Sequence, residues 1–352
     1  MDGWMIYGAN GYTGRMIAEK AARSGLKPVL AGRNASVAAL AGALGLEARM
    51  FPLDDQAAMM AGLAGIKLVL HCAGPFSATA APMMAACLRA GAHYLDITGE
   101  IDVFEHAYAL DAQAKARGVV ICPGAGFDVV PTDCLAQALK EALPDATDLA
   151  LGFDSRSPLS PGTSKTMVEG LGQGGMIRRG GALVRVPFAW RERKIDFGAG
   201  LKSAVTIPWG DVSTAFRSTG IGTIECYIAV SPRAASGMRK MRLLRPLLGL
   251  GFVQTLLKRR IERKVSGPDA RSRDKTETFV WGEVTNLKGE KRVGRVRTPN
   301  GYSLTVDSAL ALVRILLEGP HGQVGFLTPS QLGGKALLES LPGVGTIAIG
   351  KE

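Results

Sequence analysis

WMIYGANGYTGRMIAEKAAR, residues 4–23, is the stretch that decides the fold of this chain. Its apolar start predicts a strand ending at Tyr7, the glycines at positions 8, 11 and 14 predict a tight turn, and a helix is expected over residues 14–23. Glycines at this spacing let the backbone turn sharply and approach a pyrophosphate, while the amides that open the helix offer hydrogen-bond donors and a partial positive charge. The stretch therefore indicates a nucleotide-binding βαβ unit, and a glycine turn without a nucleotide is the alternative.

The end of the second expected strand, residues 28–31, distinguishes the two nicotinamide cofactors. An NAD site places a carboxylate there to hold the ribose 2′-hydroxyl, and that carboxylate repels a 2′-phosphate. This strand is instead followed by Gly32 and Arg33. A small residue leaves room for the phosphate, and a guanidinium can bind it through two hydrogen bonds, so NADP(H) is the predicted cofactor. A solvated surface charge is the alternative for Arg33.

The first third of the sequence alternates six strands with helices. This alternation predicts an α/β fold, a Rossmann doubly wound parallel sheet, and right-handed crossovers place the carboxyl ends of its strands along one edge. After the first strand, the expected strands span residues 28–31, 48–51, 67–72, 93–96 and 119–122, and the expected helices span residues 14–23, 36–44, 56–63, 78–90 and 103–117.

From about residue 124 the strands become shorter and the turns more frequent, which predicts a second domain of mixed α+β structure. Residues 157–164 and 170–181 are rich in glycine and proline and are expected to be loops, the second with Arg178 and Arg179 in it. We expect strands at residues 148–153, 183–186, 203–207, 222–230, 277–284 and 292–298, with a turn at 286–289. The predicted domains are residues 1–124, which bind NADP, residues 125–326, for substrate and dimerisation, and residues 327–352, a C-terminal segment returning to the Rossmann domain.

Composition limits the class of protein. The chain has 352 residues, 47% of them hydrophobic, enough for two domains and a substantial core. No charged and apolar leader is apparent, and no run of about eighteen uncharged apolar residues occurs, so a cytoplasmic protein is expected. The five cysteines form no CxxC pair and the four histidines lack ligand spacing, so neither a disulfide nor a metal is expected.

Most of the net charge of +11 lies in one segment. Residues 233–264 hold ten Lys or Arg against one acidic residue, Glu262, a local charge of +9. A nucleic-acid module would interleave aromatic residues, and this segment has only Phe252, so no nucleic-acid partner is expected. Within residues 238–264 basic clusters alternate with leucines. Such a segment could rest peripherally on an anionic membrane, dock an acyl carrier protein, or pack as a core or dimer helix, and all three stay open.

A set of motifs occurs in order along the chain: residues 8–14 with Arg33, residues 72–76, 94–100, 123–128, 160–163 and 208–214. Together they resemble the saccharopine dehydrogenase-like NADP-binding oxidoreductases, including their trans-acting enoyl reductase branch. The resemblance implies a Rossmann domain with an inserted α+β domain, pyridine-nucleotide chemistry and homodimers. It also implies either saccharopine as substrate or acyl chains carried by polyketide synthases, and the basic, apolar residues 243–257 depart from the amino-acid enzymes.

The residues expected to hold NADP lie where strands end. Residues 73–76 follow the fourth strand, so their backbone and the Phe76 ring are expected to border the ribose and nicotinamide, the alternative being a hydrophobic plug. Asp54 follows the third strand and is expected either to contact the adenine end or to cap the next helix. The predicted cofactor-binding residues are Gly8, Asn10, Gly11, Tyr12, Thr13, Gly14, Arg33, Asn34, Asp54, Ala73, Gly74, Pro75 and Phe76.

The catalytic residues are unknown at this point, because in hydride transfer the nicotinamide carries the chemistry and the protein positions it. Glu100 and Asp128 each follow a strand at the carboxyl edge, and either could donate a proton if burial shifts its pKa. Lys165, at the start of a helix in the second domain, is a third weak candidate. Glu169, Tyr12 and Tyr302 are also able to donate, and helix caps or surface ion pairs are the alternatives for the charged residues.

These observations predict an NADPH-dependent oxidoreductase. The expected reaction is reduction of a C=C or C=N bond in an apolar small-molecule or carrier-linked acyl substrate. One alternative is a saccharopine-type amino-acid dehydrogenase, which needs cations for the substrate carboxylates, and Arg178 with Arg179 are the obvious pair. The other alternative is a membrane-associated or redox-sensing protein that holds NADP(H) without turnover.

Overall fold

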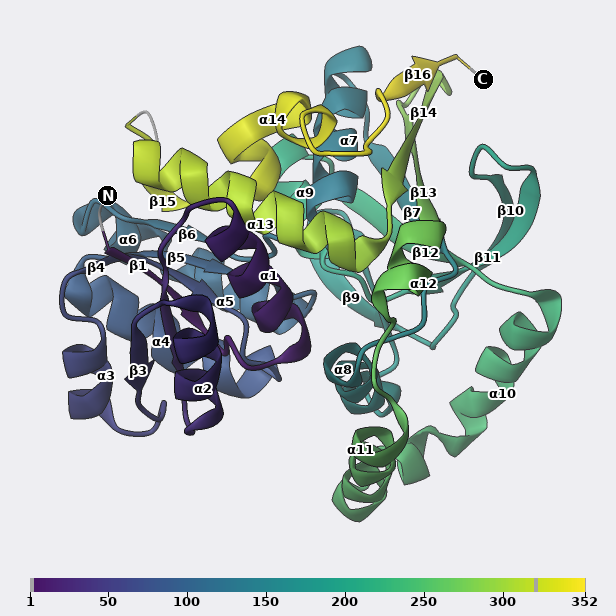
Figure 1. The fold of residues 1–352 in the computed structure, drawn as a ribbon. Coiled ribbons are helices and arrows are strands. Elements are labelled where there is room, and N and C mark those ends of the chain that lie inside the picture. Colours follow the sequence, from purple (N-terminus) through teal and green to yellow (C-terminus); the bar gives the residue numbers. More distant parts are fainter. Residues whose placement is uncertain (1–2, 320–321, 352) are drawn as a thin grey trace. The chain divides into compact units, whose positions relative to one another are not determined.

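The computed structural model describes residues 3–319 and 322–351, and its contacts divide the chain into two units (Figure 1). Unit 1 comprises Met1–Val130 and Tyr302–Gly333, and unit 2 comprises Pro131–Gly301 and Gly334–Glu352. The chain therefore passes between the units three times. The sequence had suggested only three consecutive segments, residues 1–124, 125–326 and 327–352.

Unit 1 is built on a seven-stranded parallel sheet with the order β15-β6-β5-β4-β1-β2-β3. The strand order runs outward on both sides of the β1–β4 pair, as in a doubly wound sheet, so the predicted Rossmann α/β fold is confirmed. The strands are β1 (Gly3–Tyr7), β2 (Val29–Gly32), β3 (Ala48–Met50), β4 (Ile66–His71), β5 (His93–Asp96), β6 (Val120–Cys122) and β15 (Gly325–Phe326), and the helices are α1 (Tyr12–Arg23), α2 (Ser36–Leu44), α3 (Gln56–Gly62), α4 (Phe76–Ala90), α5 (Ile101–Ala109), α6 (Asp111–Ala116) and α13 (Gly301–Glu318).

The central strands are apolar on both faces, because each face of a doubly wound sheet is covered by helices. Met5 and Ile6 of β1 are 0% exposed, and so is the run from Leu68 to Leu70 in β4. This continuous burial explains why the strands of unit 1 could be placed from the sequence, whereas the expected single helix over residues 103–117 is split into α5 and α6 at Leu110.

Residues 302–333 group with unit 1, not with the second domain to which residues 302–326 were assigned from the sequence. Two contacts account for this. The Lys20 ammonium of α1 pairs with the Asp307 carboxylate of α13, and β15 adds to the sheet beside β6. The C-terminal segment was expected to return to the Rossmann domain. Its last strand, β16 (Ala348–Gly350), instead pairs antiparallel with β14 (Lys291–Pro299) of unit 2.

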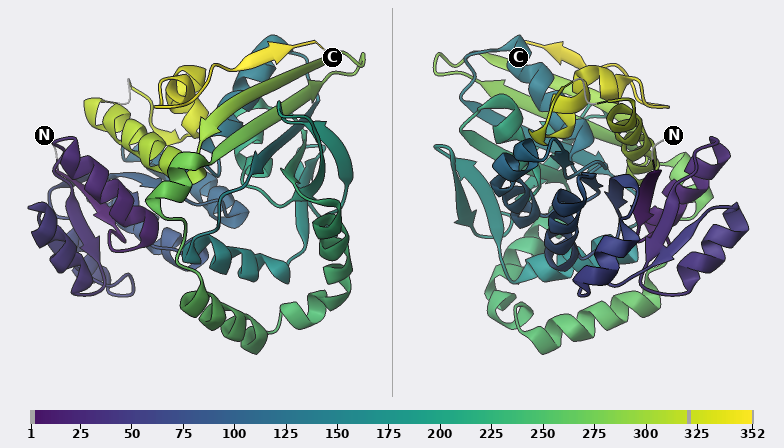
Figure 2. Two further views of the ribbon diagram at one scale, coloured as in Figure 1. Left: turned by 45° about the vertical axis from the view of Figure 1, so that its right-hand side comes forward. Right: turned by 90° about the vertical axis from the view of Figure 1, so that its left-hand side faces the viewer.

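Unit 2 is built on a nine-stranded mixed sheet, in which β7 and β12 pair in parallel and the other pairs are antiparallel. Its two long neighbours β13 and β14 are seen side by side in Figure 2. The path is β10-β11-β12-β7-β13-β14-β16, with β8 pairing β12 and β9. The strands are β7 (Asp148–Ser155), β8 (Gly175–Arg179), β9 (Ala182–Val186), β10 (Glu192–Asp196), β11 (Leu201–Ile207), β12 (Thr223–Ala229), β13 (Glu277–Thr285), β14 (Lys291–Pro299) and β16.

In the described part of the chain, the helices that accompany this sheet are α7 (Val130–Ala142), α8 (Pro161–Leu171), α9 (Asp211–Thr219), α10 (Pro232–Leu248), α11 (Gly251–Lys264), α12 (Ala270–Lys275) and the part of α14 (Pro329–Glu339) that follows its kink at Gly334. Among the described residues, every helix is too short or too polar to cross a membrane.

The six strands predicted in this region are present, and the expected turn is closed by the Gly289 amide donating to the Asn286 carbonyl at 3.0 Å. The two predicted loops are partly wrong. The first ends in α8, which begins at Pro161 because the Ser160 hydroxyl accepts from the Thr163 amide. The second contains β8, so Arg178 lies in a strand.

Candidate functional site

The glycine-rich turn between β1 and α1 lies at the carboxyl edge of the sheet of unit 1. Gly8 has a φ of +83°, and an added Cβ there would lie 2.7 Å from the amide nitrogen of Ala73. A Cβ on Gly14 would lie 2.3 Å from the carbonyl oxygen of Gly8. Gly11, the residue before α1, offers no side chain to cap this helix. The turn therefore presents close-packed backbone and a helix N-terminus, which suits a pyrophosphate.

Polar side chains continue this edge at the end of β2. The Asn10 amide donates to the Asn34 side chain at 3.3 Å and to the Ser36 hydroxyl at 2.9 Å. Gly32 leaves no room for a side chain, because its Cβ would lie 2.7 Å from a methyl of Val37. Arg33 follows directly and is exposed. A cation with neighbouring hydroxyl and amide groups, and no carboxylate at the strand end, fits a ribose 2′-phosphate.

The loop after β3 brings Asp54 to the same side. The hydroxyl of the β1 residue Tyr7 donates to the Phe51 carbonyl at 2.9 Å. Burial raises the pKa of Tyr7 to about 12, and Arg33 lowers it while Asp54 raises it, so both charges act on this hydroxyl. Asp54 does not cap α3. The cap is Asp55, whose carboxylate accepts from the Ala58 amide at 2.9 Å.

The loop between β4 and α4 is held by a hydroxyl and a carboxylate. Thr79 donates to the Ala73 carbonyl at 2.6 Å, and Glu100 accepts from the amides of Phe76 and Ser77 at 3.0 and 2.6 Å. The Phe76 ring is 9% exposed and lies edge-on to His71, with 5.5 Å between the ring centroids. The ring therefore belongs to the core, and the backbone of this loop is the part that reaches the carboxyl edge.

A buried carboxylate, Asp96, joins the ends of β5 and β6. It accepts from the amides of Thr98 and Gly124 at 3.0 and 2.9 Å and from the Tyr94 hydroxyl at 2.8 Å. Burial raises the pKa of Asp96 to about 6, although these hydrogen bonds oppose the shift. Sequence reasoning did not single out this network. The sequence did contain a signal for the contact between Tyr94 and Asp96: residues two apart in a strand lie on the same face of the sheet.

Asp128 lies at the same edge, after β6. It is partly buried against Gly99, where a Cβ would lie 2.7 Å from an Asp128 carboxylate oxygen. Burial and then the Glu100 charge raise the pKa of Asp128 to about 7. Within residues 3–319 and 322–351, no group is found donating a hydrogen bond to this carboxylate. Of the candidates at this edge, Asp128 is the one that titrates near neutral pH.

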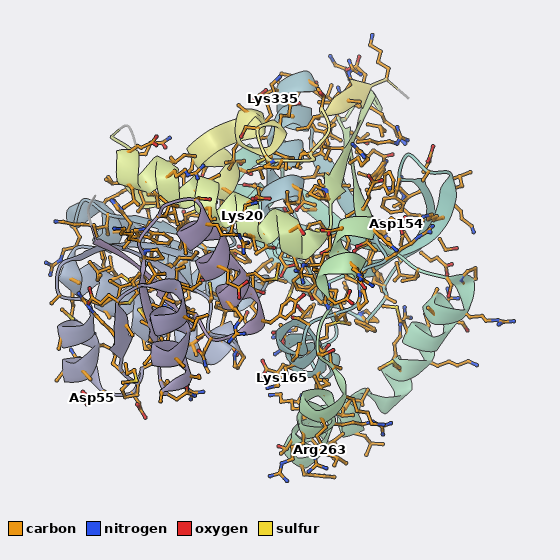
Figure 3. All side chains as sticks on the ribbon, in the orientation of Figure 1. Lys20, Asp55, Asp154, Lys165, Arg263 and Lys335 are labelled. Carbon is orange, nitrogen blue, oxygen red and sulfur yellow. The ribbon has the colours of Figure 1, made fainter. Side chains whose placement is uncertain are left out.

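Of the remaining candidate proton donors, Tyr12 lies in the glycine-rich turn itself, Tyr302 lies in α13, and the others lie in unit 2. Tyr12 and Tyr302 pack their rings together in unit 1, with centroids 5.2 Å apart. Lys165, labelled in Figure 3, belongs to α8 of unit 2. Glu169 belongs to the same helix and pairs with Lys258 at 2.6 Å. No group of three or more His, Cys, Asp or Glu that could hold a metal ion was found among the described residues.

The expectation that Arg178 and Arg179 form a cationic loop is wrong for Arg178. This side chain is 3% exposed, donates to the carbonyls of Val212 and Gly181 at 2.6 Å each, and lies over the Phe216 ring. It is occupied in holding unit 2 together, so it is not available to a substrate carboxylate.

Comparisons with known proteins agree with this geometry. Residues 4–122 match the family model of the saccharopine dehydrogenase NADP binding domain. The chain is 31% identical over 183 residues to a trans-acting enoyl reductase of Mycobacterium bovis (strain BCG / Pasteur 1173P2), covering 47% of this chain and 44% of that protein. It is 35% identical over 156 residues to a trans-acting enoyl reductase of Mycobacterium leprae (strain TN), covering 41% and 37%. The chain spans less than half the length of the curated relatives it matches.

A solved structure shares the fold. Saccharopine dehydrogenase (L-Glu forming) of Saccharomyces cerevisiae superimposes with a TM-score of 0.68 over 100% of both chains at 11% identity. This likeness shows the fold, and it is residues 4–122 that match the model of a saccharopine dehydrogenase NADP binding domain. The predicted cofactor and the resemblance stated from the motifs are confirmed.

Proposed function

We propose that the chain is an NADPH-dependent reductase of a C=C bond in an apolar or carrier-linked acyl substrate. One observation carries the proposal: an NADP cradle and a carboxylic acid that titrates near pH 7 lie on one edge of one sheet. The relatives named trans-acting enoyl reductases favour C=C over C=N and over an amino-acid substrate. The cytoplasmic location and the homodimer stay predictions.

The residues that would hold the cofactor follow from the geometry of unit 1. The turn from Gly8 to Gly14 would take the pyrophosphate, Arg33 with Asn34 the 2′-phosphate, and Asp54 the adenine end. The backbone of residues 73–75 would border the nicotinamide, and Phe76 would support it from the core. When bound, NADPH supplies a hydride to the substrate.

Asp128 is the proton donor in this proposal. Hydride addition to one carbon of a double bond leaves an electron pair on the neighbouring carbon, which must take a proton. Glu100 is occupied by the amides of Phe76 and Ser77, which it holds in place at the start of α4, so its role in this proposal is to position that loop. Asp128 keeps its proton up to about pH 7, would transfer it to that carbon, and would regain one from water. Lys165, in unit 2, is the weaker candidate.

The test is the single-turnover rate of NADPH oxidation, followed by stopped-flow absorbance against a panel of short and long enoyl thioesters and one imine. At least one thioester should accelerate the loss of NADPH by about 100-fold or more. If NADPH binds tightly and no acceptor accelerates its loss, the proposal fails and the protein is a non-catalytic NADP(H)-binding protein.

The proton donor is tested in the same assay with Asp128→Asn. The wild-type rate should fall as the pH rises through about 7, because the acid form is the active one. The variant should lose about 100-fold in rate at pH 6 and lose this pH dependence, while its affinity for NADPH stays within about twofold. Asp102→Asn is the matched control, because Asp102 is an exposed carboxylate in the first turn of α5. A D128N enzyme that keeps the wild-type pH profile would show that the proton comes from another group.

A further inference from the structure

The segment with most of the positive charge forms two helices, α10 and α11, joined by a short turn. In Figure 2 both are seen in green; α10 contacts β11, and α11 packs on α8. Four large apolar side chains near the turn stand in solvent: Leu247 is 57% exposed, Leu250 41%, Phe252 73% and Leu256 66%. Unpaired apolar side chains of this size, gathered within ten residues, mark an interaction surface.

Helix α11 has two distinct faces. Leu257, Lys258 and Ile261 are partly buried on the side that packs on α8, where Lys258 pairs with Glu169. The opposite side is exposed along its whole length. It carries Phe252 and Leu256 in its first half and, in its second half, the cations Arg259, Arg260, Arg263 and Lys264. We name this exposed side, together with Leu247 and Leu250, the basic–apolar face; Figure 3 labels its Arg263.

The cations of this face find no acidic partner among the side chains that the structure describes. None of the four forms an ion pair with any residue that the structure describes. On α10, Arg233 and Lys240 are exposed as well, whereas Arg239 pairs with Glu192. The segment is therefore a positive surface open to solvent, and its field favours a partner of opposite charge.

We propose that the basic–apolar face docks on an anionic phospholipid surface, with Phe252 and Leu256 inserted among the acyl chains and the α11 cations at the headgroups. Two observations favour lipid over an acidic protein. The apolar side chains protrude singly around a helix turn, and a bilayer accepts such side chains without complementary pockets. The exposed cations are spread over both helices, from Arg233 and Lys240 on α10 to residues 259–264 on α11, which suits an extended charged plane.

The experiment is flotation of the whole protein with vesicles of phosphatidylcholine alone or with 30% phosphatidylglycerol added. Each exposed cation near an anionic surface raises partitioning about fivefold at low salt, so binding should be strong only with phosphatidylglycerol and should weaken in about 0.5 M salt. Arg259→Gln with Arg260→Gln should weaken binding about 25-fold. Phe252→Ser with Leu256→Ser should weaken it at least about tenfold, because their insertion is lost.

Matched controls separate this face from general effects of charge and exposure. Arg23→Gln with Lys27→Gln removes two exposed cations of unit 1, and Leu201→Ser with Leu287→Ser removes two exposed leucines that are 73% and 90% accessible. Both should bind vesicles within about twofold of wild type. All changed side chains are exposed, so the far-ultraviolet spectrum and melting temperature should stay unchanged.

Three outcomes would overturn the proposal: equal binding to both vesicle types, equal losses in the controls, or no vesicle binding by a protein that binds an acidic acyl carrier protein through the same residues. NADPH oxidation with a soluble thioester is independent of the face, so it should be the same in all four variants.

Discussion

Arg33→Gln is the change that most directly tests how this chain selects its cofactor. Arg33 is exposed at the end of β2, beside the Asn10, Asn34 and Ser36 cluster, and Gly32 before it carries no carboxylate, unlike the strand end of an NAD site. A hydrogen bond to a charged group is worth about 1.5–3 kcal/mol. Glutamine keeps one such bond to the phosphate and loses the charge, so we expect a loss of about 2–3 kcal/mol. This corresponds to an increase in the Kd for NADPH of about 30- to 150-fold.

The assay is a fluorescence titration with NADPH and NADH at one fixed ionic strength, because the phosphate contact is screened by salt. The Kd for NADH should stay within about twofold, since NADH has no 2′-phosphate for residue 33 to meet. Arg23→Gln, at the exposed end of α1, is the control for a general loss of positive charge. The reasoning is refuted if R33Q leaves the Kd for NADPH unchanged, or if it weakens NADPH and NADH equally.

Three further changes test the packing behind the site. Gly14→Ala places a Cβ 2.3 Å from the Gly8 carbonyl oxygen, so the turn must open, and calorimetry should show at least about 100-fold weaker NADPH binding. Asp96→Ala leaves three buried donors without an acceptor and should lower the free energy of unfolding in urea by about 3–6 kcal/mol, whereas Asp96→Asn should cost less. Burial raises the pKa of Asp96 from 3.8 to about 6, so its protonated form stabilises the folded state fully below about pH 4, and this stabilisation is lost as the pH rises through about 6. The free energy of unfolding should therefore fall by about 3 kcal/mol over this range, and D96N should lack this decrease. Arg178→Met leaves two backbone carbonyls without their donor and should lower the free energy of unfolding by about 2–4 kcal/mol, while the affinity for NADPH stays unchanged.

The fold of unit 1 could be predicted from the sequence because its signals are local. Strands buried on both faces are continuous apolar runs, as in Leu68–Leu70, and the glycine-rich turn has a fixed place between strand and helix. The position of residues 302–333 could not be predicted in this way. Strand β15 is two residues long, and it is a strand only because it pairs with β6, a partner about 200 residues away. Pairing of this kind leaves no periodic pattern in the sequence.

In unit 2, strand β8 was not predicted from the sequence because it contains charged residues. Gly175–Arg179 lies between glycines and ends in two arginines, a composition typical of a loop. It forms β8 because Arg178 is satisfied by two carbonyls and the Phe216 ring, all brought by other elements. A buried arginine is tolerated only with such partners, and the sequence does not reveal whether they exist.

Asp96, Glu100 and Asp128 each follow a strand at the carboxyl edge, and the sequence pointed to Glu100 and Asp128 as candidates but not to Asp96. In the structure these acids differ in burial and in their hydrogen-bond donors. Asp96 has three hydrogen-bond donors, Glu100 has the two amides that open α4, and none is found for Asp128 among the described residues. Donors stabilise the ionised form, so the carboxyl without them is the one that retains a proton at the highest pH. Gly99 makes this possible, because any side chain there would displace the Asp128 carboxylate. A carboxyl kept without donors beside a second acid costs stability, and such a cost is typical of positions selected for chemistry.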